Sequence, residues 1–239
     1  ASLLFQGNLL DGQLVREPHN VLAIGVNKDN LDHAEAEALW LASQISGELL
    51  IGHMATLANV EKTLVNRTLV HFSCHGKFQR HHPMSSALVL SDGDLTAQHI
   101  LQSIRLRSEL VTLSACDSGL NQIAPGDELM GLSRAFLGAG ARALLITLWQ
   151  VLEIPARLFM EAFYRKWQQG DSKAAALLGA QQYIRTMDVE YLRRQLFIYG
   201  VSEALADEMT DRLVSMNPGK NPLDHPYYWA AFVLIGNPQ

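Results

Sequence analysis

The sequence LVHFSCHGKF, from Leu69 to Phe78, combines the composition of a buried strand with the chemistry of a site. Its apolar and β-favouring residues end abruptly on His75 and Gly76, as in a strand that delivers polar groups to the edge of a sheet. A second sequence, LVTLSACDSG from Leu110 to Gly119, ends its own apolar run on Cys116. Because the carboxyl ends of parallel strands lie at one edge of a sheet, His75 and Cys116 are expected to meet there.

Strands and helices alternate along the rest of the chain. Apolar runs predict further buried strands at 20–27, 47–54, 141–149 and 227–236. Helical spacing predicts helices at 31–45, 56–66, 96–104, 127–140 and 155–169, with two or three more between 172 and 216. The expected N-caps are Asp32, Thr56 or Asn59, and Asp127. Asp92-Gly93 predicts a hairpin turn.

This alternation defines the expected fold class as α/β. We expect a mostly parallel sheet of about six strands with helices on both faces. No repeat, low-complexity tract or linker divides the sequence, so residues 1–239 are predicted to form a single domain. Residues 1–19 are a candidate N-terminal appendage to it.

Composition and charge exclude several classes of protein. The 239 residues are 48% hydrophobic and 18% charged, and their formal net charge of −5 includes no basic stripe. This balance allows a large buried core and argues against contact with nucleic acid. No apolar run approaches the ~20 residues that cross a bilayer, and no secretory signal is visible, so we expect no membrane contact. Two cysteines, Cys74 and Cys116, are too few for a disulfide framework and fit a reducing, cytoplasmic compartment.

A thiol beside an imidazole is a nucleophile beside a base. The thiolate is the attacking species, and a neighbouring His lowers the pKa of a thiol from its usual ~8.5. Gly76 lets the backbone pass close to a substrate carbonyl. The backbone N–H groups of Gly76 and Cys116 are therefore the expected oxyanion hole, where one donor contributes roughly 3–4 kcal/mol. This chemistry needs no metal and no other cofactor.

Four segments of the chain together resemble CHAT domains, which are caspase-like peptidases related to separase and often fused to tetratricopeptide repeats. The segments are SCHGKF (73–78), TLSACDSGL (112–120), GDELMGLSRAFLGAGARALLITLWQV (126–151) and HPYYWAAFVLIG (225–236). The resemblance runs from about Val21 to the C-terminus. It implies a caspase-haemoglobinase-like fold with a Cys116–His75 catalytic dyad.

The function that the resemblance implies is a cysteine endopeptidase cutting one or few protein partners. It suggests a regulated bacterial signalling or defence protease of the cytoplasm, gated by an N-terminal or separate tetratricopeptide-like region. The alternative is a catalytically silent CHAT domain that acts as a scaffold or interaction module. A nucleotide-binding domain is a third interpretation, suggested by AIGVN at 23–27, but the chain has neither G-x-G-x-x-G nor a P-loop.

The expected substrate-binding residues are Asp117, Trp149, Gln150 and Glu153. Asp117 follows the nucleophile, and Trp149 and Gln150 end the fifth strand. Separase-like relatives have acidic residues after the Leu-Trp of this strand, which help to recognise a basic side chain. In the present run, LWQVLEIPA, only Glu153 is acidic. A strong preference for Arg or Lys before the scissile bond is therefore not expected.

Cys74 and the other histidines have simpler interpretations. Cys74 alternates with His75 along the strand and is expected to pack as a small hydrophobe. A zinc site built from Cys74, His75, His81, His82 and Cys116 would lack the regular ligand spacing of such sites. His81 and His82 are interpreted as residues of a solvated loop.

Overall fold

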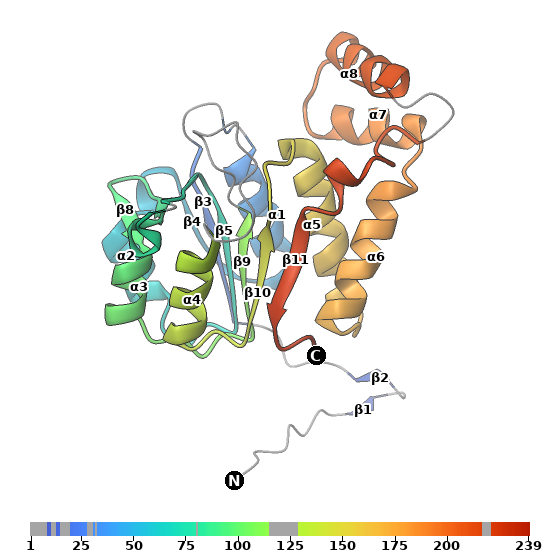
Figure 1. Cartoon of the computed structure of the whole chain (residues 1–239). Helices are drawn as coiled ribbons and strands as arrows, with labels where there is room; N and C mark the ends of the chain where they lie inside the picture. The colour runs from blue at the N-terminus through green and yellow to red at the C-terminus, as the bar shows by residue number, and fades with distance from the viewer. Residues whose placement is uncertain are drawn as a thin grey trace.

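The computed structural model describes residues 9–10, 13–14, 20–27, 31, 33–79, 81–114, 129–216 and 221–239. Its centre is a six-stranded sheet with the spatial order β11, β10, β9, β5, β3, β4 (Figure 1). In that order the strands span Phe232–Gly236, Ala143–Thr147, Leu110–Ser114, Leu69–Ser73, Val21–Gly25 and Glu48–Ile51. Each of the six lies within a stretch that was expected to form a strand.

Neighbouring strands of this sheet are parallel except at one edge, where β11 runs antiparallel to β10. The expectation of a mostly parallel sheet is therefore confirmed. Strands β3, β5 and β10 are buried along their whole length, as continuous apolar runs indicate for strands covered on both faces. The last strand begins at Phe232 rather than at 227, because Pro226–Tyr228 form a 3₁₀ turn (η3) and Pro has no N–H for a ladder.

Helices cover both faces of the sheet. One face packs against α1 (Ala34–Ile45), α5 (Glu153–Gln168) and α6 (Lys173–Arg185). The other packs against α2 (Leu57–Thr63), α3 (Ala97–Ser103) and α4 (Leu129–Ala139). Helices α7 (Val189–Ile198) and α8 (Glu203–Met216) form a hairpin beyond the sheet, at the top of Figure 1. The predicted α/β class with two helical layers is confirmed.

Two smaller sheets accompany the central one. Strands β6 (Gly76–Lys77), β7 (Ala87–Val89) and β8 (Asp94–Thr96) form an antiparallel sheet directly after β5. The turn from β7 to β8 is closed by the Leu90 N–H, which donates to the Gly93 carbonyl at 2.8 Å, so the predicted hairpin is confirmed. Strands β1 (Leu9–Leu10) and β2 (Gln13–Leu14) pair with each other.

The helix starts agree only in part with the expected N-caps. Thr56 caps α2, and its side chain accepts a hydrogen bond from the Asn59 N–H at 3.2 Å. The N-cap of α1 is His33, whose side chain makes no capping bond, and the expected cap Asp32 lies outside the described residues. A first-turn donor, the Glu35 N–H, is satisfied instead by the Asn27 side chain at 2.9 Å. Asp127 lies outside the described residues.

Candidate active site

The candidate site lies at the carboxyl ends of the two central strands β5 and β9. These strands are parallel neighbours, and their last residues, Ser73 and Ser114, pair directly in the register. His75 follows two positions after Ser73, and Cys116 follows two positions after Ser114. Neighbouring strands lie ~4.8 Å apart, so the last residues of β5 and β9 lie side by side at this edge of the sheet.

His75 occupies the short connection between β5 and the antiparallel sheet. Its side chain is half-buried, and its backbone carbonyl accepts a hydrogen bond from the Val89 N–H at 2.8 Å. Gly76 follows as the first residue of β6; it is buried and pairs with Leu88. The backbone on either side of the imidazole is therefore fixed, because β5 holds it on one side and the antiparallel sheet on the other.

The residues predicted to act together with His75 belong to a part of the chain that the structure does not describe. Cys116 and Asp117 lie within residues 115–128, outside the described residues. The nucleophile, its backbone N–H in the oxyanion hole, and the Asp117 contact to substrate therefore stay predictions. The described feature on which these predictions rest is the register of β5 and β9.

The end of β10 brings Trp149 and Gln150 to the same edge of the sheet. Trp149 is half-buried, and its indole N–H donates to the Tyr227 carbonyl at 2.9 Å, which ties the end of β10 to the turn before β11. Gln150 is exposed, and so are Leu148 (41%) and Leu152 (48%). Among the described residues that directly follow β10, the exposed side chains are thus one amide and two apolar groups.

Glu153 is the first residue of α5 and is half-buried. Its carboxylate accepts a hydrogen bond from the His33 backbone N–H at 3.0 Å. This bond joins the starts of α1 and α5 across 120 residues of sequence. Part of the acceptor capacity of Glu153 is thus used within the protein, which weakens its suitability as a partner for a basic substrate side chain.

Cys74 is fully buried and belongs to the apolar core between the sheet and helices α2, α3 and α4. Burial raises the pKa of its thiol to about 12, and a hydrogen bond with the Val89 backbone lowers it only in part. A thiol in this state is neither a nucleophile nor a metal ligand near neutral pH. The expectation that Cys74 packs as a small hydrophobe is confirmed.

We therefore predict that Cys74 resists alkylation in the folded protein. With a pKa of about 12, only about one thiol in 10⁴ is ionised at pH 8. Iodoacetamide at pH 8, followed by peptide mass spectrometry, should leave Cys74 unmodified until denaturant is added. A Cys74→Ala variant, which keeps a small apolar side chain there, should lose little of the peptidase activity that the resemblance to CHAT domains implies. Rapid labelling of Cys74 in the native protein would contradict this account of the core.

A buried polar network that was not predicted from the sequence crosses the other face of the two site strands. His71 of β5 is fully buried, and its Nε2 lies 2.8 Å from a Glu37 carboxylate oxygen of α1. Its Nδ1 lies 2.9 Å from the Tyr164 hydroxyl of α5, which in turn is 2.7 Å from Thr112 Oγ1 of β9. Burial raises the pKa of the Tyr164 phenol far above its usual range, so this hydroxyl keeps its proton.

The network joins both site strands to helices from distant parts of the sequence. His71 and Thr112 are register partners on β5 and β9, so one hydrogen-bonded set holds α1, α5 and the two strands together. Two sequence signals were available. His71 interrupts an apolar strand, and Glu37 adjoins Ala38 on the apolar face of its helix.

The described residues give no support for a metal site. No group of three or more His, Cys, Asp or Glu side chains suited to a metal ion occurs among them. His81 and His82 are exposed, as expected for a solvated loop. His99 pairs with Glu61 on the surface of α3 and α2. Likewise, no described helix is long and apolar enough to cross a membrane.

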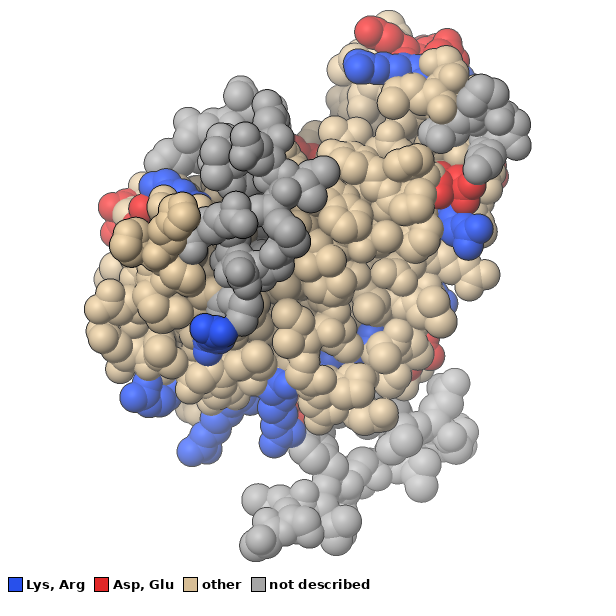
Figure 2. Space-filling model, in the orientation of Figure 1, with Lys and Arg blue, Asp and Glu red and all other residues tan. Residues whose placement is uncertain are grey.

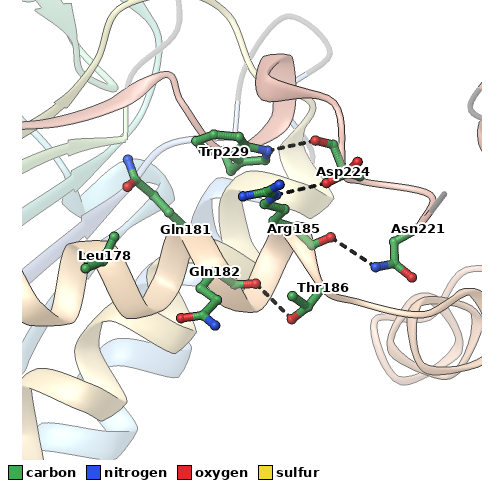
Figure 3. A pocket seen from close by; sticks show the side chains of 8 residues that line it. All are labelled: Leu178, Gln181, Gln182, Arg185, Thr186, Asn221, Asp224 and Trp229. Carbon is green, nitrogen blue, oxygen red and sulfur yellow. Dashed lines mark hydrogen bonds and ion pairs between the residues drawn. The ribbon is translucent and has the colours of Figure 1, made fainter.

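A pocket of about 410 Å³ lies between α6 and the segment that precedes β11 (Figure 3). The Arg185 side chain donates to Asp224 at 3.0 Å and its guanidinium carbon lies 5.9 Å from the centre of the Trp229 ring. The Trp229 indole N–H donates to the Asp224 carbonyl at 3.0 Å. These groups use much of their hydrogen-bonding capacity on one another. No residue expected at the active site lines the pocket.

The fold and the paired strand ends define an α/β domain whose candidate site lies at the carboxyl edge of a central parallel sheet. Residues 8–237 match the CHAT domain family. The chain therefore belongs to the CHAT domain family, and the resemblance noted in its motifs is confirmed. This match covers nearly the whole sequence.

Two similar proteins are much longer than this chain. Tetratricopeptide repeat protein 28 of Mus musculus is 27% identical over 242 residues, covering 85% of this chain and 8% of that protein. The Homo sapiens protein of the same name is 25% identical over the same length, again with 85% and 8% covered. The chain thus spans about 8% of the length of these relatives.

Two solved structures share part of the fold at low sequence identity. Gingipain R, described as an Arg-specific cysteine proteinase, gives a TM-score of 0.49 at 12% identity, over 68% of this chain and 42% of the other. The separase–securin complex of Saccharomyces cerevisiae gives a TM-score of 0.49 at 18% identity, over 72% of this chain and 11% of the other.

Proposed function

We propose that this CHAT domain is a cysteine endopeptidase in which Cys116 is the nucleophile and His75 the general base and acid. The observation that supports it best is the direct pairing of Ser73 with Ser114, because each predicted catalytic residue follows its strand end by two positions. Nucleophile and base then share one edge of a rigid sheet, which favours the precise geometry that such a pair requires.

The proposed reaction is acyl transfer through a thioester. His75 takes the thiol proton of Cys116, and the thiolate attacks the substrate carbonyl carbon. The backbone N–H groups of Gly76 and Cys116 hold the resulting oxyanion. His75 returns the proton to the leaving amine as the C–N bond breaks. Water, activated by the same imidazole, then hydrolyses the thioester and restores the thiol.

Substrate side chains are proposed to lie against Asp117, Trp149, Gln150 and Glu153. The exposed Leu152 and Gln150 at the end of β10 favour an uncharged residue before the scissile bond. A basic side chain placed beside Leu152 would lose solvation without a full counter-charge. Glu153 already accepts a hydrogen bond from the His33 N–H, so it is poorly placed to supply that charge.

We therefore predict a cleavage profile dominated by apolar or neutral residues before the scissile bond. The measurement is cleavage of a peptide library by the wild-type domain, with products identified by mass spectrometry. Glu153→Gln should change the relative rates for neutral and basic residues by less than about threefold, since the expected specificity does not depend on that charge. A profile dominated by Arg or Lys, lost in Glu153→Gln, would show that the assignment of the specificity pocket is wrong.

The biological setting is proposed from the family. The relatives are named for tetratricopeptide repeats, and this supports a tetratricopeptide-like region that regulates the domain. One or few proteins are proposed as its substrates. A cytoplasmic location is proposed from the scarcity of cysteine. The bacterial source suggested by the family resemblance stays a prediction, since the relatives named above are mammalian.

Cleavage of the peptide library also distinguishes the endopeptidase from the alternative function, a silent scaffold. For an endopeptidase, cleavage should be present in the wild-type domain and absent in Cys116→Ala, whereas a scaffold should cleave in neither case. An electrophilic thiol reagent at pH 6 is used in parallel, since its reaction with the thiolate does not depend on activation by a regulatory region. An activated thiolate reacts well below pH 8.5, whereas an ordinary thiol does not. Absence of both cleavage and reaction would favour the scaffold.

A further inference from the structure

Three arginines from separate parts of the sequence lie together at the amino edge of the central sheet, opposite the candidate active site. Arg105 and Arg107 precede β9, and Arg142 immediately precedes its neighbour β10. All three are exposed. Figure 2 shows Lys and Arg side chains gathered along the lower edge of the molecule, beneath α3 and α4. We call Arg105, Arg107 and Arg142 the arginine platform.

The backbone beneath the platform is locked by hydrogen bonds between its two loops. The Leu106 N–H donates to the Ala139 carbonyl at 2.7 Å, and the Arg142 N–H donates to the Ser108 carbonyl at 2.9 Å. Gly140 permits this approach: its φ is +117°, and a Cβ there would lie 2.2 Å from the Leu106 carbonyl oxygen. The three side chains therefore project from a fixed base, and little backbone ordering would accompany binding.

The platform arginines have no carboxylate partner among the residues that the structure describes. No ion pair among the described residues includes any of the three arginines. Arg105 donates to the carbonyls of Leu101 at 3.3 Å and Ile104 at 2.8 Å, which holds its guanidinium at the end of α3. Arg67, at the start of the adjacent strand β5, behaves differently because Glu48 pairs with it.

We propose that the arginine platform binds an acidic, extended segment of a polypeptide partner. Guanidinium groups pair with carboxylates in bidentate fashion, and three of them on one edge match several acidic side chains in a row. Leu101, 40% exposed at the end of α3, offers an apolar contact beside the charges. The formal net charge of −5 over the whole chain disfavours a long polyanion such as RNA, which would extend past the platform. This proposal does not depend on the endopeptidase activity.

The test is binding of a fluorescein-labelled decapeptide rich in Asp and Glu, followed by fluorescence anisotropy with the whole 239-residue chain. We expect binding in 50 mM NaCl that weakens about tenfold or more by 300 mM, since salt screens exposed charges. The triple variant R105E/R107E/R142E should weaken binding at least tenfold. A peptide with Asn and Gln in place of the acids should not bind.

Two controls keep the result interpretable. R194E reverses a charge on the exposed surface of α7, away from the platform, and should leave binding within twofold. R107Q/R142Q spares the Arg105 contacts at the end of α3 and is used if the triple variant fails to fold. No binding in 50 mM NaCl, or an equal loss in R194E, would overturn the proposal. Tighter binding of a single-stranded RNA decamer that the same variants abolish would also overturn it, in favour of nucleic acid.

Discussion

Replacing either member of the dyad, as Cys116→Ala or His75→Ala, is expected to reduce peptide cleavage by about 10³-fold or more. The thiolate supplies the bond-forming electrons and the imidazole moves the proton, so neither can be replaced by water at a comparable rate. Because the two residues act as a unit, the double variant should be hardly less active than either single one. Initial rates on the best library peptide measure all three variants.

The matched control for the nucleophile is Cys74→Ala. It removes the other thiol from the apolar core, where burial raises the pKa to about 12, and should retain most activity. Circular dichroism should show that all variants keep the fold, since His75 lies in a half-buried connection outside the main core. Loss of activity in Cys74→Ala with retention in Cys116→Ala would reverse the assignment of the nucleophile.

The second large effect is a loss of stability, expected when the buried network around His71 is broken. His71→Phe should lower the free energy of unfolding by about 3–5 kcal/mol, because it leaves the buried Glu37 carboxylate without its imidazole partner. The ring of Phe keeps much of the volume, so lost packing is a smaller part of the effect. Equilibrium urea denaturation followed by circular dichroism measures the change.

Two further variants separate the buried charge from other causes. The double variant Glu37→Leu/His71→Phe should recover part of the stability, since apolar groups replace the whole pair. His99→Gln disrupts the partly exposed pair with Glu61 and should change stability by less than about 1 kcal/mol. If His71→Phe were as mild as His99→Gln, the network would not be an important link between helices and strands.

Most of the central sheet was predictable because its strands carry continuous apolar runs. Val21–Gly25, Leu69–Ser73 and Ala143–Thr147 are buried on both faces, and this burial leaves a strong signal in composition. The start of the last strand was less predictable. Tyr227 and Tyr228 have high strand propensity, but Pro226 directs them into a 3₁₀ turn.

The sequence predicted that the candidate site follows the ends of two strands, but it did not predict how those strand ends are aligned. The sequence placed His75 and Cys116 after apolar runs, whereas the direct pairing of Ser73 with Ser114 is a property of the register. The His71 network was missed because a polar residue within an apolar run shows nothing of its partners on distant helices. The arginine platform was missed for a related reason: Arg107 and Arg142 are neighbours only after folding.

The most direct test of the proposed dyad is covalent labelling with a peptidyl acyloxymethyl ketone, a reagent that alkylates activated catalytic thiolates. The domain is incubated with the reagent at pH 7, digested, and the modified residue is located by mass spectrometry. We expect a single modification on Cys116 that is at least tenfold slower in His75→Ala, because the imidazole stabilises the thiolate. Labelling of Cys74, or labelling of Cys116 at the same rate with and without His75, would contradict the account.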